Sequence, residues 1–312
     1  MYKGRFAPSP TGQLHLGSAA AALFCAAAAR RAGGRLVLRI EDIDTPRVIE
    51  GVESLIERDL AWLGIGFDES PSKGGPSAPY RQSERLGLYE AALGVLARAG
   101  HVYLCDCSRA DIARIASAPH LGEEGPVYPG TCRDLGMDVR AFKRAPAHRL
   151  RVGAGTLRYL DGVDGLVDID ASLVGDFVLR RGDGVFSYQL ATLVDDLAMD
   201  VTEVVRGRDL ISSAPRQAVL ARLLGREPPV YTHIPLLAGR DGARLSKREG
   251  AVTIFGQRER GVASDVLSRA IAAAYGHPLS ADGDPVGELA KKFDAARFPG
   301  ECVDVHRIID FT

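Results

Sequence analysis

Apolar runs and helical spacing alternate along the first third of the chain. Residues 3–8 and 35–40 are short apolar or β-branched runs bounded by Gly and Pro, and each predicts a strand. The alanine-rich segment 18–32 lies between them and predicts a helix that stops at Gly33 and Gly34. A strand, a helix and a strand in this order predict a βαβ unit with parallel strands.

Helical spacing recurs over residues 50–63 and 83–99. Three leucines mark the apolar stripe of the second segment: Leu86, Leu93 and Leu96. These helices complete the first predicted segment, residues 1–100, which we interpret as the first half of the α/β domain.

The pattern changes at His101. Short strand-like runs and Gly-Asp turns follow, and they predict an α+β insertion over residues 101–187. The predicted strands and turns are 149–152, 156–160, 177–179, Asp161-Gly162 and Asp183-Gly184.

From Tyr188 the α/β pattern returns and predicts the second half of the sheet domain over residues 188–260. Its expected elements are an apolar run at 190–197, a strand at 201–205, a helix at 212–224 and a strand at 233–237. Helices at 262–275 and 286–293 predict a small helical C-terminal region over 261–312. The fold class is therefore α/β: a Rossmann-like parallel sheet split by an α+β insertion, followed by a small helical region.

Composition describes an ordinary soluble globular protein, with 312 residues, 46% of them apolar and 25% charged. No apolar run approaches the roughly 20 residues that span a bilayer. The chain starts with strand-like residues, so we expect no signal peptide, no membrane partner and a cytoplasmic location. Because the net charge is −1, a nucleic-acid partner has to be held by local basic patches.

Three of the five cysteines form a cluster in the sequence, Cys105-x-Cys107 followed by Cys132. In a reducing compartment this spacing favours a structural zinc site over disulfides. Three thiolates leave one ligand position, for which His101, His120 or water are chemically suitable. A catalytic cysteine is disfavoured, since no His/Asp arrangement of a thiol hydrolase accompanies it.

Two distant segments carry the candidate chemistry. Residues 5–18, RFAPSPTGQLHLGS, run from a strand through a Pro/Gly turn into a helix, which places backbone N–H groups and His15 around an anion. Residues 244–248, RLSKR, supply the point charge of Lys247 between glycines, which suits a triphosphate. Taken singly, His15 could merely cap a helix and Lys247 could lie on an exposed basic turn.

Together these segments resemble the HIGH and KMSKS signatures of class I aminoacyl-tRNA synthetases, and FAPSPTGQLHLGS resembles the glutamyl branch. Further matching segments are Arg39 to Thr45, Cys105 to Cys132, Tyr188-Gln189-Leu190 and Val205 to Asp209. The resemblance covers nearly the whole chain. It is closest to the glutamyl-queuosine tRNA(Asp) synthetases, the short glutamyl-tRNA synthetase-like branch without an anticodon-binding domain.

The resemblance implies activation of glutamate by ATP, with His15 and Lys247 as the catalytic residues. Gly17 and Ser246 join them in binding ATP, and Mg²⁺ is carried by the ATP phosphates. The second signature departs from KMSKS at its ends, Arg244 and Arg248, but keeps Ser246-Lys247.

Glutamate has two carboxylates and one ammonium, so its site needs arginines and one acidic residue. Arg5 and Arg206 can bind carboxylates bidentately, Glu41 can pair with the ammonium, and Tyr188 can form a wall. The resemblance adds the first loop to the glutamate site: Phe6, Ala7, Pro8 and Ser9. Alternatives are an ordinary surface ion pair of Arg206 with Asp209 and a core position for Tyr188.

The resemblance also assigns Tyr128 as the fourth zinc ligand and makes the insertion zinc-bearing. Only residues 262–312 follow Gly261, too few for an anticodon-binding domain. For a chain of this length, the resemblance implies that the acceptor is the queuosine base of tRNA(Asp). The expected partners of this monomer are ATP, L-glutamate and queuosine-bearing tRNA(Asp). Alternatives are a truncated glutamyl-tRNA synthetase charging tRNA(Glu), a non-catalytic ATP- or glutamate-binding paralogue, and an adenylate-forming ligase with an amine acceptor.

Overall fold

The computed structural model describes residues 1–115, 127–138, 140–239 and 252–312. The chain divides into two compact units. The first unit consists of residues 1–84, 201–210 and 230–312, and the second of residues 85–200 and 211–229. These bounds differ from the four predicted segments, because residues 188–200 group with the insertion and the C-terminal region groups with the first strand. The four-segment organisation therefore stays a prediction.

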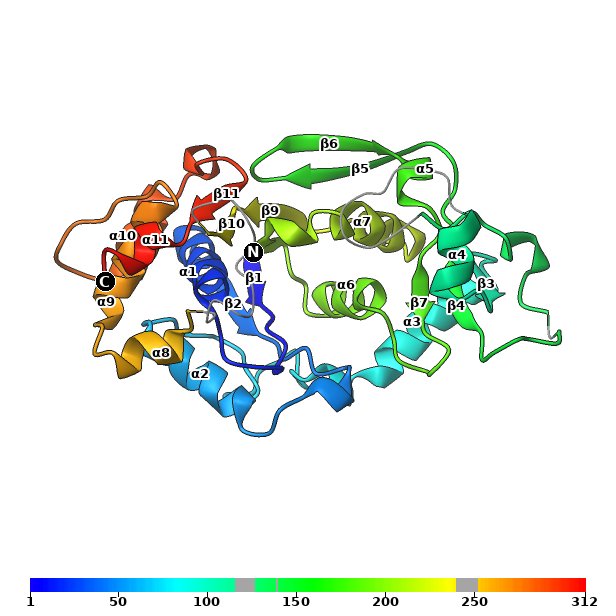
Figure 1. Cartoon of the computed structure of the whole chain (residues 1–312), viewed down its shortest axis with the longest axis horizontal. Helices are drawn as coiled ribbons and strands as arrows, with labels where there is room; N and C mark the ends of the chain where they lie inside the picture. The colour runs from blue at the N-terminus through cyan, green and yellow to red at the C-terminus, as the bar shows by residue number, and fades with distance from the viewer. Residues whose placement is uncertain (116–126, 139, 240–251) are drawn as a thin grey trace. The chain divides into compact units, whose positions relative to one another are not determined.

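A parallel sheet forms the centre of the first unit (Figure 1). Its strands run in the order β2-β1-β8-β9. Their bounds are β1 Lys3–Phe6, β2 Arg35–Leu38, β8 Glu203–Gly207 and β9 Val230–Ile234. β1 pairs with β2 on one side and with β8 on the other, and all these pairs are parallel. The predicted parallel sheet is confirmed.

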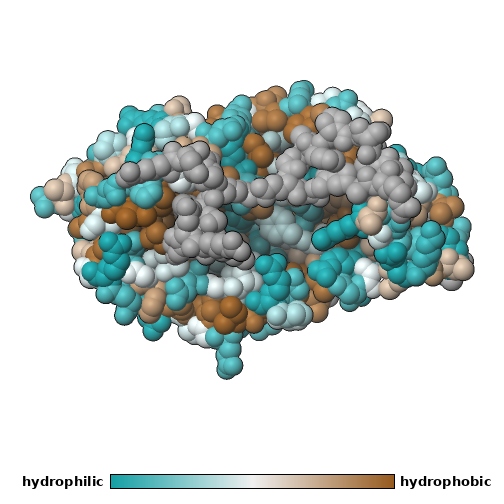
Figure 2. Space-filling model, in the orientation of Figure 1, coloured by the Kyte–Doolittle hydropathy of each residue, from teal (hydrophilic) through white to brown (hydrophobic). Residues whose placement is uncertain are grey.

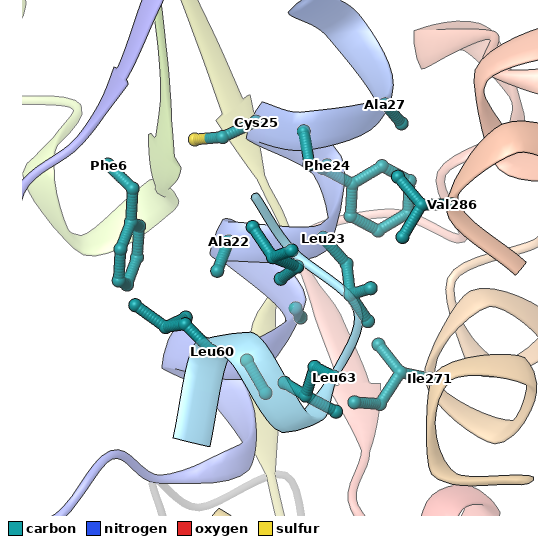
Figure 3. Close-up of a cluster of buried hydrophobic side chains, with 14 of the residues drawn as sticks. Phe6, Ala22, Leu23, Phe24, Cys25, Ala27, Leu60, Leu63, Ile271 and Val286 are labelled. Carbon is teal, nitrogen blue, oxygen red and sulfur yellow. The ribbon is translucent and has the colours of Figure 1, made fainter. Parts of the chain in front are cut away.

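Helix α1, Leu16–Arg31, carries apolar side chains on nearly all of its faces, and these faces are buried by neighbours on two sides. It packs on β1 and β8, and helices α9 (Ser264–Ala274) and α10 (Pro285–Lys292) contact it as well. Small alanine side chains let these neighbours approach closely. Figure 3 shows Leu23 and Phe24 of α1 among Leu63, Ile271 and Val286.

The remaining elements of the first unit surround this core. They are α2 Val52–Trp62, α8 Ile254–Glu259, α11 His306–Ile309 and the short 3-10 turns Thr45–Arg47, Gln82–Glu84, Arg208–Leu210 and Ala295–Arg297. Strands β10, Leu236–Ala238, and β11, Cys302–Asp304, form a separate parallel pair. The C-terminal region thus combines helices with one strand.

Among its described residues, the second unit contains a three-stranded antiparallel sheet, an antiparallel hairpin and five helices. One sheet has the order β3-β4-β7, and β5 and β6 form a hairpin. The strands are β3 Val102–Cys105, β4 Ala147–Leu150, β5 Thr156–Asp161, β6 Gly165–Asp170 and β7 Val178–Arg180. The helices are α3 Leu86–Arg98, α4 Arg109–Ile115, α5 Ala171–Val174, α6 Tyr188–Ala198 and α7 Ser213–Leu223, with a 3-10 turn at Arg133–Leu135.

Two local predictions are corrected. Leu86 is 47% exposed, because the buried face of α3 is formed by Tyr89, Leu93 and Leu96. The predicted strand 233–237 spans the end of β9 and the start of β10, which are interrupted at Pro235. Strands β3 and β6 were not predicted.

No helix within the described ranges combines the length and apolarity needed to cross a bilayer. In the face drawn in Figure 2, hydrophilic and hydrophobic residues are interspersed over the described surface.

Candidate active site

The candidate site lies where the parallel strands of the first unit end. From β1 the chain passes through α1 to β2, whereas β8 lies on the opposite side of β1. Such a reversal of strand order opens a crevice at the carboxyl ends of the strands, where ligands of α/β sheets bind. The turn before α1, the residues after β2 and the end of β8 all lie at this edge.

His15 is the N-cap of α1, since its Nδ1 accepts a hydrogen bond from Ser18 N at 3.2 Å. An accepting Nδ1 leaves the proton of the neutral imidazole on Nε2, which lies 3.2 Å from Ser18 Oγ. Loss of hydration lowers the pKa of His15, although the Asp209 carboxylate opposes this shift. His15 is therefore a neutral hydrogen-bond donor at the positive end of a helix.

The absence of a side chain at Gly17 leaves space for the His15 imidazole. A Cβ at this position would lie 2.9 Å from both Cε1 and Nδ1 of His15. Any side chain at Gly17 would therefore displace the imidazole.

The first loop runs beside the segment after β2. Arg39 N donates to the Phe6 carbonyl, and Glu41 N donates to the Pro8 carbonyl, both at 3.0 Å. Phe6 lies in the hydrophobic core and Pro8 is buried, whereas Ala7 is half-buried and Ser9 is exposed. The Phe6 side chain is thus a core residue, and a ligand could meet this residue only through its backbone.

Arg5 and Glu41 have protein partners of their own. Arg5, on β1, is 4% exposed, and its Nη1 donates to the Val205 carbonyl at 3.5 Å. Glu41 accepts a hydrogen bond from Nη2 of the fully buried Arg39 at 3.1 Å. Glu41 is therefore a carboxylate held in place by an arginine.

Arg206 lies at the end of β8 and is 4% exposed. Its Nε donates to His233 Nε2 at 3.1 Å, and its guanidinium carbon lies 4.8 Å from the centre of the Tyr231 ring. The alternative interpretation, an ordinary surface ion pair of Arg206 with Asp209, is wrong because Arg206 is not at the surface. The histidine support was not foreseen, because it depends on the register that places Arg206 opposite His233.

Tyr188 belongs to the second unit, where it is the half-buried first residue of α6. It is not a fully buried core aromatic. Ser246 and Lys247 lie outside the described residues, as does His120.

The described residues on either side of 240–251 lie close to the His15 turn. Leu16 N donates to the Val252 carbonyl at 3.0 Å, and Ile254 N donates to the Leu14 carbonyl at 2.9 Å. On the other side, Leu237 Cδ1 is 3.9 Å from the Cβ position of Gly17.

In the second unit, Cys105, Cys107 and Cys132 have sulfur atoms within 4.8 Å of one another. The sulfurs of Cys107 and Cys132 are 3.7 Å apart, and Tyr128 Oη lies 3.3 Å from the Cys105 sulfur and 3.7 Å from the Cys107 sulfur. A tetrahedral zinc ion separates two sulfurs by about 3.8 Å and sulfur from oxygen by about 3.5–3.7 Å. The three sulfurs could therefore hold a metal ion, and the Tyr128 oxygen lies close to two of them.

Without a metal, the surroundings of the cluster favour ionisation of Cys105 and oppose ionisation of Cys107 and Tyr128. Burial opposes ionisation of Cys105, but the Tyr128 hydrogen bond and the Arg149 charge outweigh it and lower the pKa of that thiol. Burial and the neighbouring sulfurs raise the pKa of Tyr128. The guanidinium carbon of Arg149 lies 4.0 Å from the centre of the Tyr128 ring, and Cys132 N donates a hydrogen bond to Tyr128 Oη at 2.9 Å. Both contacts would stabilise a phenolate on a metal.

Many arginines outside this site are already paired with acidic side chains. The pairs are Arg30–Asp284, Arg140–Asp106, Arg151–Asp134, Arg180–Glu90 and Arg181–Asp183. These arginines bring less positive charge to an RNA than their number in the sequence suggests.

Comparison with known proteins gives the family. The profile described as "tRNA synthetases class I (E and Q), catalytic domain" matches residues 2–274. The chain is 47% identical to a glutamyl-Q tRNA(Asp) synthetase of Symbiobacterium thermophilum, with 98% of this chain and 96% of that protein covered. It is 49% identical to a protein of the same name from Nitratidesulfovibrio vulgaris, with 84% and 82% covered.

Among solved structures, a glutamate tRNA ligase from Elizabethkingia meningosepticum in complex with its amino acid is similar to this chain. The TM-score is 0.81 at 26% identity, and the similarity covers 99% of this chain and 68% of that chain. The chain therefore belongs to the class I tRNA synthetases of the E and Q group, whose catalytic domain it carries.

Proposed function

We propose that this protein is an ATP-dependent ligase that forms glutamyl-adenylate and transfers the glutamate to the queuosine base in the anticodon of tRNA(Asp). Two relatives at 47% and 49% identity are named for this activity on tRNA(Asp). The family membership supports ATP, glutamate and tRNA as partners. We expect the chain to act as a monomer in the cytoplasm.

The main support for this proposal is that two buried arginines and a neutral histidine, which caps a helix, lie at the same edge of the parallel sheet. Arg5 and Arg206 are each the last residue but one of neighbouring strands, so their guanidinium groups can bind the two carboxylates of a dianionic amino acid. Glu41 supplies the negative charge for its ammonium. The resemblance also assigns Tyr188 to glutamate binding.

In the first step, a carboxylate oxygen of glutamate attacks the α-phosphorus of ATP, and the bond to pyrophosphate breaks. Negative charge accumulates on the phosphate oxygens, so the reaction needs positioned donors and cations. His15 would donate its Nε2–H to these oxygens, and Gly17 would admit the nucleotide. Ser246 and Lys247 would bind the departing pyrophosphate, whose Mg²⁺ is carried by the phosphates.

In the second step, a hydroxyl of the queuosine base attacks the activated carbonyl, and AMP leaves. The acceptor is assigned from the names of the two relatives and from the resemblance. It does not follow from the geometry of the site.

The cluster in the second unit is assigned to one structural zinc ion, held by Cys105, Cys107, Tyr128 and Cys132. Zinc bound by four protein ligands has no open position for chemistry and contributes folding free energy. It would join β3 to the 3-10 turn at Arg133–Leu135 and stabilise the insertion.

The test is transfer of labelled glutamate to three purified tRNAs: tRNA(Asp) with queuosine, tRNA(Asp) without it, and tRNA(Glu). We expect transfer only to the first. Equal transfer to unmodified tRNA(Asp) would contradict the acceptor, and charging of tRNA(Glu) would favour the truncated glutamyl-tRNA synthetase.

A further inference from the structure

The hydroxyl of Thr253 makes two side-chain hydrogen bonds beside the His15 turn. Its Oγ1 donates to Gln13 Oε1 at 3.0 Å and accepts from Gly256 N at 3.0 Å. A threonine hydroxyl has one proton to give and lone pairs to accept, so both bonds form together. Thr253 is also the bridge partner of His15 in the short antiparallel ladder.

Thr253 is firmly held on its C-terminal side. It is the N-cap of α8, and the next residue, Ile254, is fully buried in the core. Further along α8, Arg258 Nη1 donates at 3.0 Å to Asp59, a fully buried carboxylate of α2. Helix α8 is therefore a fixed base, and Thr253 joins that base to the turn that carries His15.

Gln13 is fixed less strongly, since it is an exposed residue of the turn. It lies two residues before His15, and Thr253 lies six residues after Lys247. We propose that Gln13 and Thr253 are positioning residues for adenylate formation, whose hydrogen bond holds the His15 turn against the start of α8. This inference rests on the proposed function.

The two backbone hydrogen bonds of the ladder do not depend on either side chain, so the fold should survive the loss of this contact. A single hydrogen bond of this kind corresponds to roughly a three- to tenfold change in an equilibrium or rate. We expect the loss to appear in kcat for adenylate formation, because the turn positions the donor and Arg5 and Arg206 bind the amino acid.

The decisive variants are Gln13→Ala and Gln13→Glu, assayed by glutamate-dependent ATP–pyrophosphate exchange. Gln13→Ala removes the acceptor but leaves the cap of α8 intact, and we expect kcat to fall about three- to tenfold at an unchanged KM for glutamate. Gln13→Glu keeps an acceptor oxygen and should retain the parent kcat. Thr253→Val should lower kcat at least as much, and Thr253→Ser should restore it.

A matched control is Thr202→Val. The Thr202 hydroxyl bonds the backbone N and O of Lys3 at 3.0 and 3.3 Å, at the amino ends of the strands. It should change the melting temperature without changing kcat. The double variant Gln13→Ala/Thr253→Val should be no slower than Thr253→Val alone, because both changes remove one bond.

A parent-like kcat in Gln13→Ala would overturn the inference, even if Thr253→Val were slow, because the effect would then belong to the helix cap. Equal loss in Gln13→Glu, or additive losses in the double variant, would also overturn it. If the parent protein itself showed no glutamate-dependent exchange, the proposed function would fail and this inference with it.

Discussion

Replacing Gly17 with alanine tests the place of His15 in the reaction. The added Cβ would lie 2.9 Å from two imidazole atoms, whereas carbon atoms in contact are separated by about 3.5–4.0 Å. The imidazole must therefore move by about 0.5 Å or more. A misplacement of about 1 Å at a reacting centre can cost about 100-fold in rate, so we expect exchange to slow by about 10- to 100-fold.

Two opposing effects keep the stability of this variant close to that of the parent. Alanine is about 1 kcal/mol more favourable than glycine within a helix. Loss of the cap hydrogen bond from Ser18 N to His15 costs about 1 kcal/mol. Slow exchange in a protein of nearly unchanged melting temperature is thus the expected signature.

The matched control is Gly87→Ala. Gly87 occupies the same second position in α3 that Gly17 occupies in α1, and nothing lies within 4 Å of its Cβ position. It should gain up to about 1 kcal/mol of stability with no kinetic change. Parent-like exchange in Gly17→Ala would refute the assignment of His15 as a donor to the reacting phosphate.

Three further predictions concern the metal, the second unit and pH. Cys107→Ser should lose the single zinc ion measured by elemental analysis of purified protein, whereas Cys302→Ser, at an exposed cysteine, should keep it; equal metal content would contradict the site. Asp195→Ala should lower the free energy of unfolding by about 3–5 kcal/mol in chemical denaturation, because this fully buried carboxylate pairs with Arg85 and Tyr89 at 2.6 and 2.8 Å; a loss no larger than that of the surface variant Asp168→Ala would argue against it. Burial lowers the pKa values of His148 and His277, so below about pH 6.5 the unfolded chain binds protons that the folded chain does not. The melting temperature should therefore fall between pH 7.5 and 5.5, and a flat or rising profile would count against this.

The sheet and its first helix could be predicted because their signals are local. The alanine-rich run of α1 and the strand-like runs on either side gave the βαβ unit, with bounds within two residues. Strand β6 was missed because three of its six residues are Gly or Asp, which have low strand propensity. The apolar run 190–197 contains Asp195, whose burial depends on partners about one hundred residues earlier.

Only the site residues that lie within sequence motifs could be predicted. Segments 5–18 and 205–209 gave residues at one sheet edge, because the carboxyl ends of parallel strands meet there. The burial of Arg206 beside His233 depends on strand register, and the contact between Gln13 and Thr253 joins residues 240 positions apart. Neither contact leaves a periodic or compositional signal in the sequence.

The decisive measurement for adenylate formation is glutamate-dependent ATP–pyrophosphate exchange in the absence of tRNA. We expect exchange with L-glutamate and much weaker exchange with L-glutamine, because the amide removes the second carboxylate that the buried arginines are assigned to bind. Exchange that is absent with glutamate, or equally fast with glutamine, would contradict this expectation.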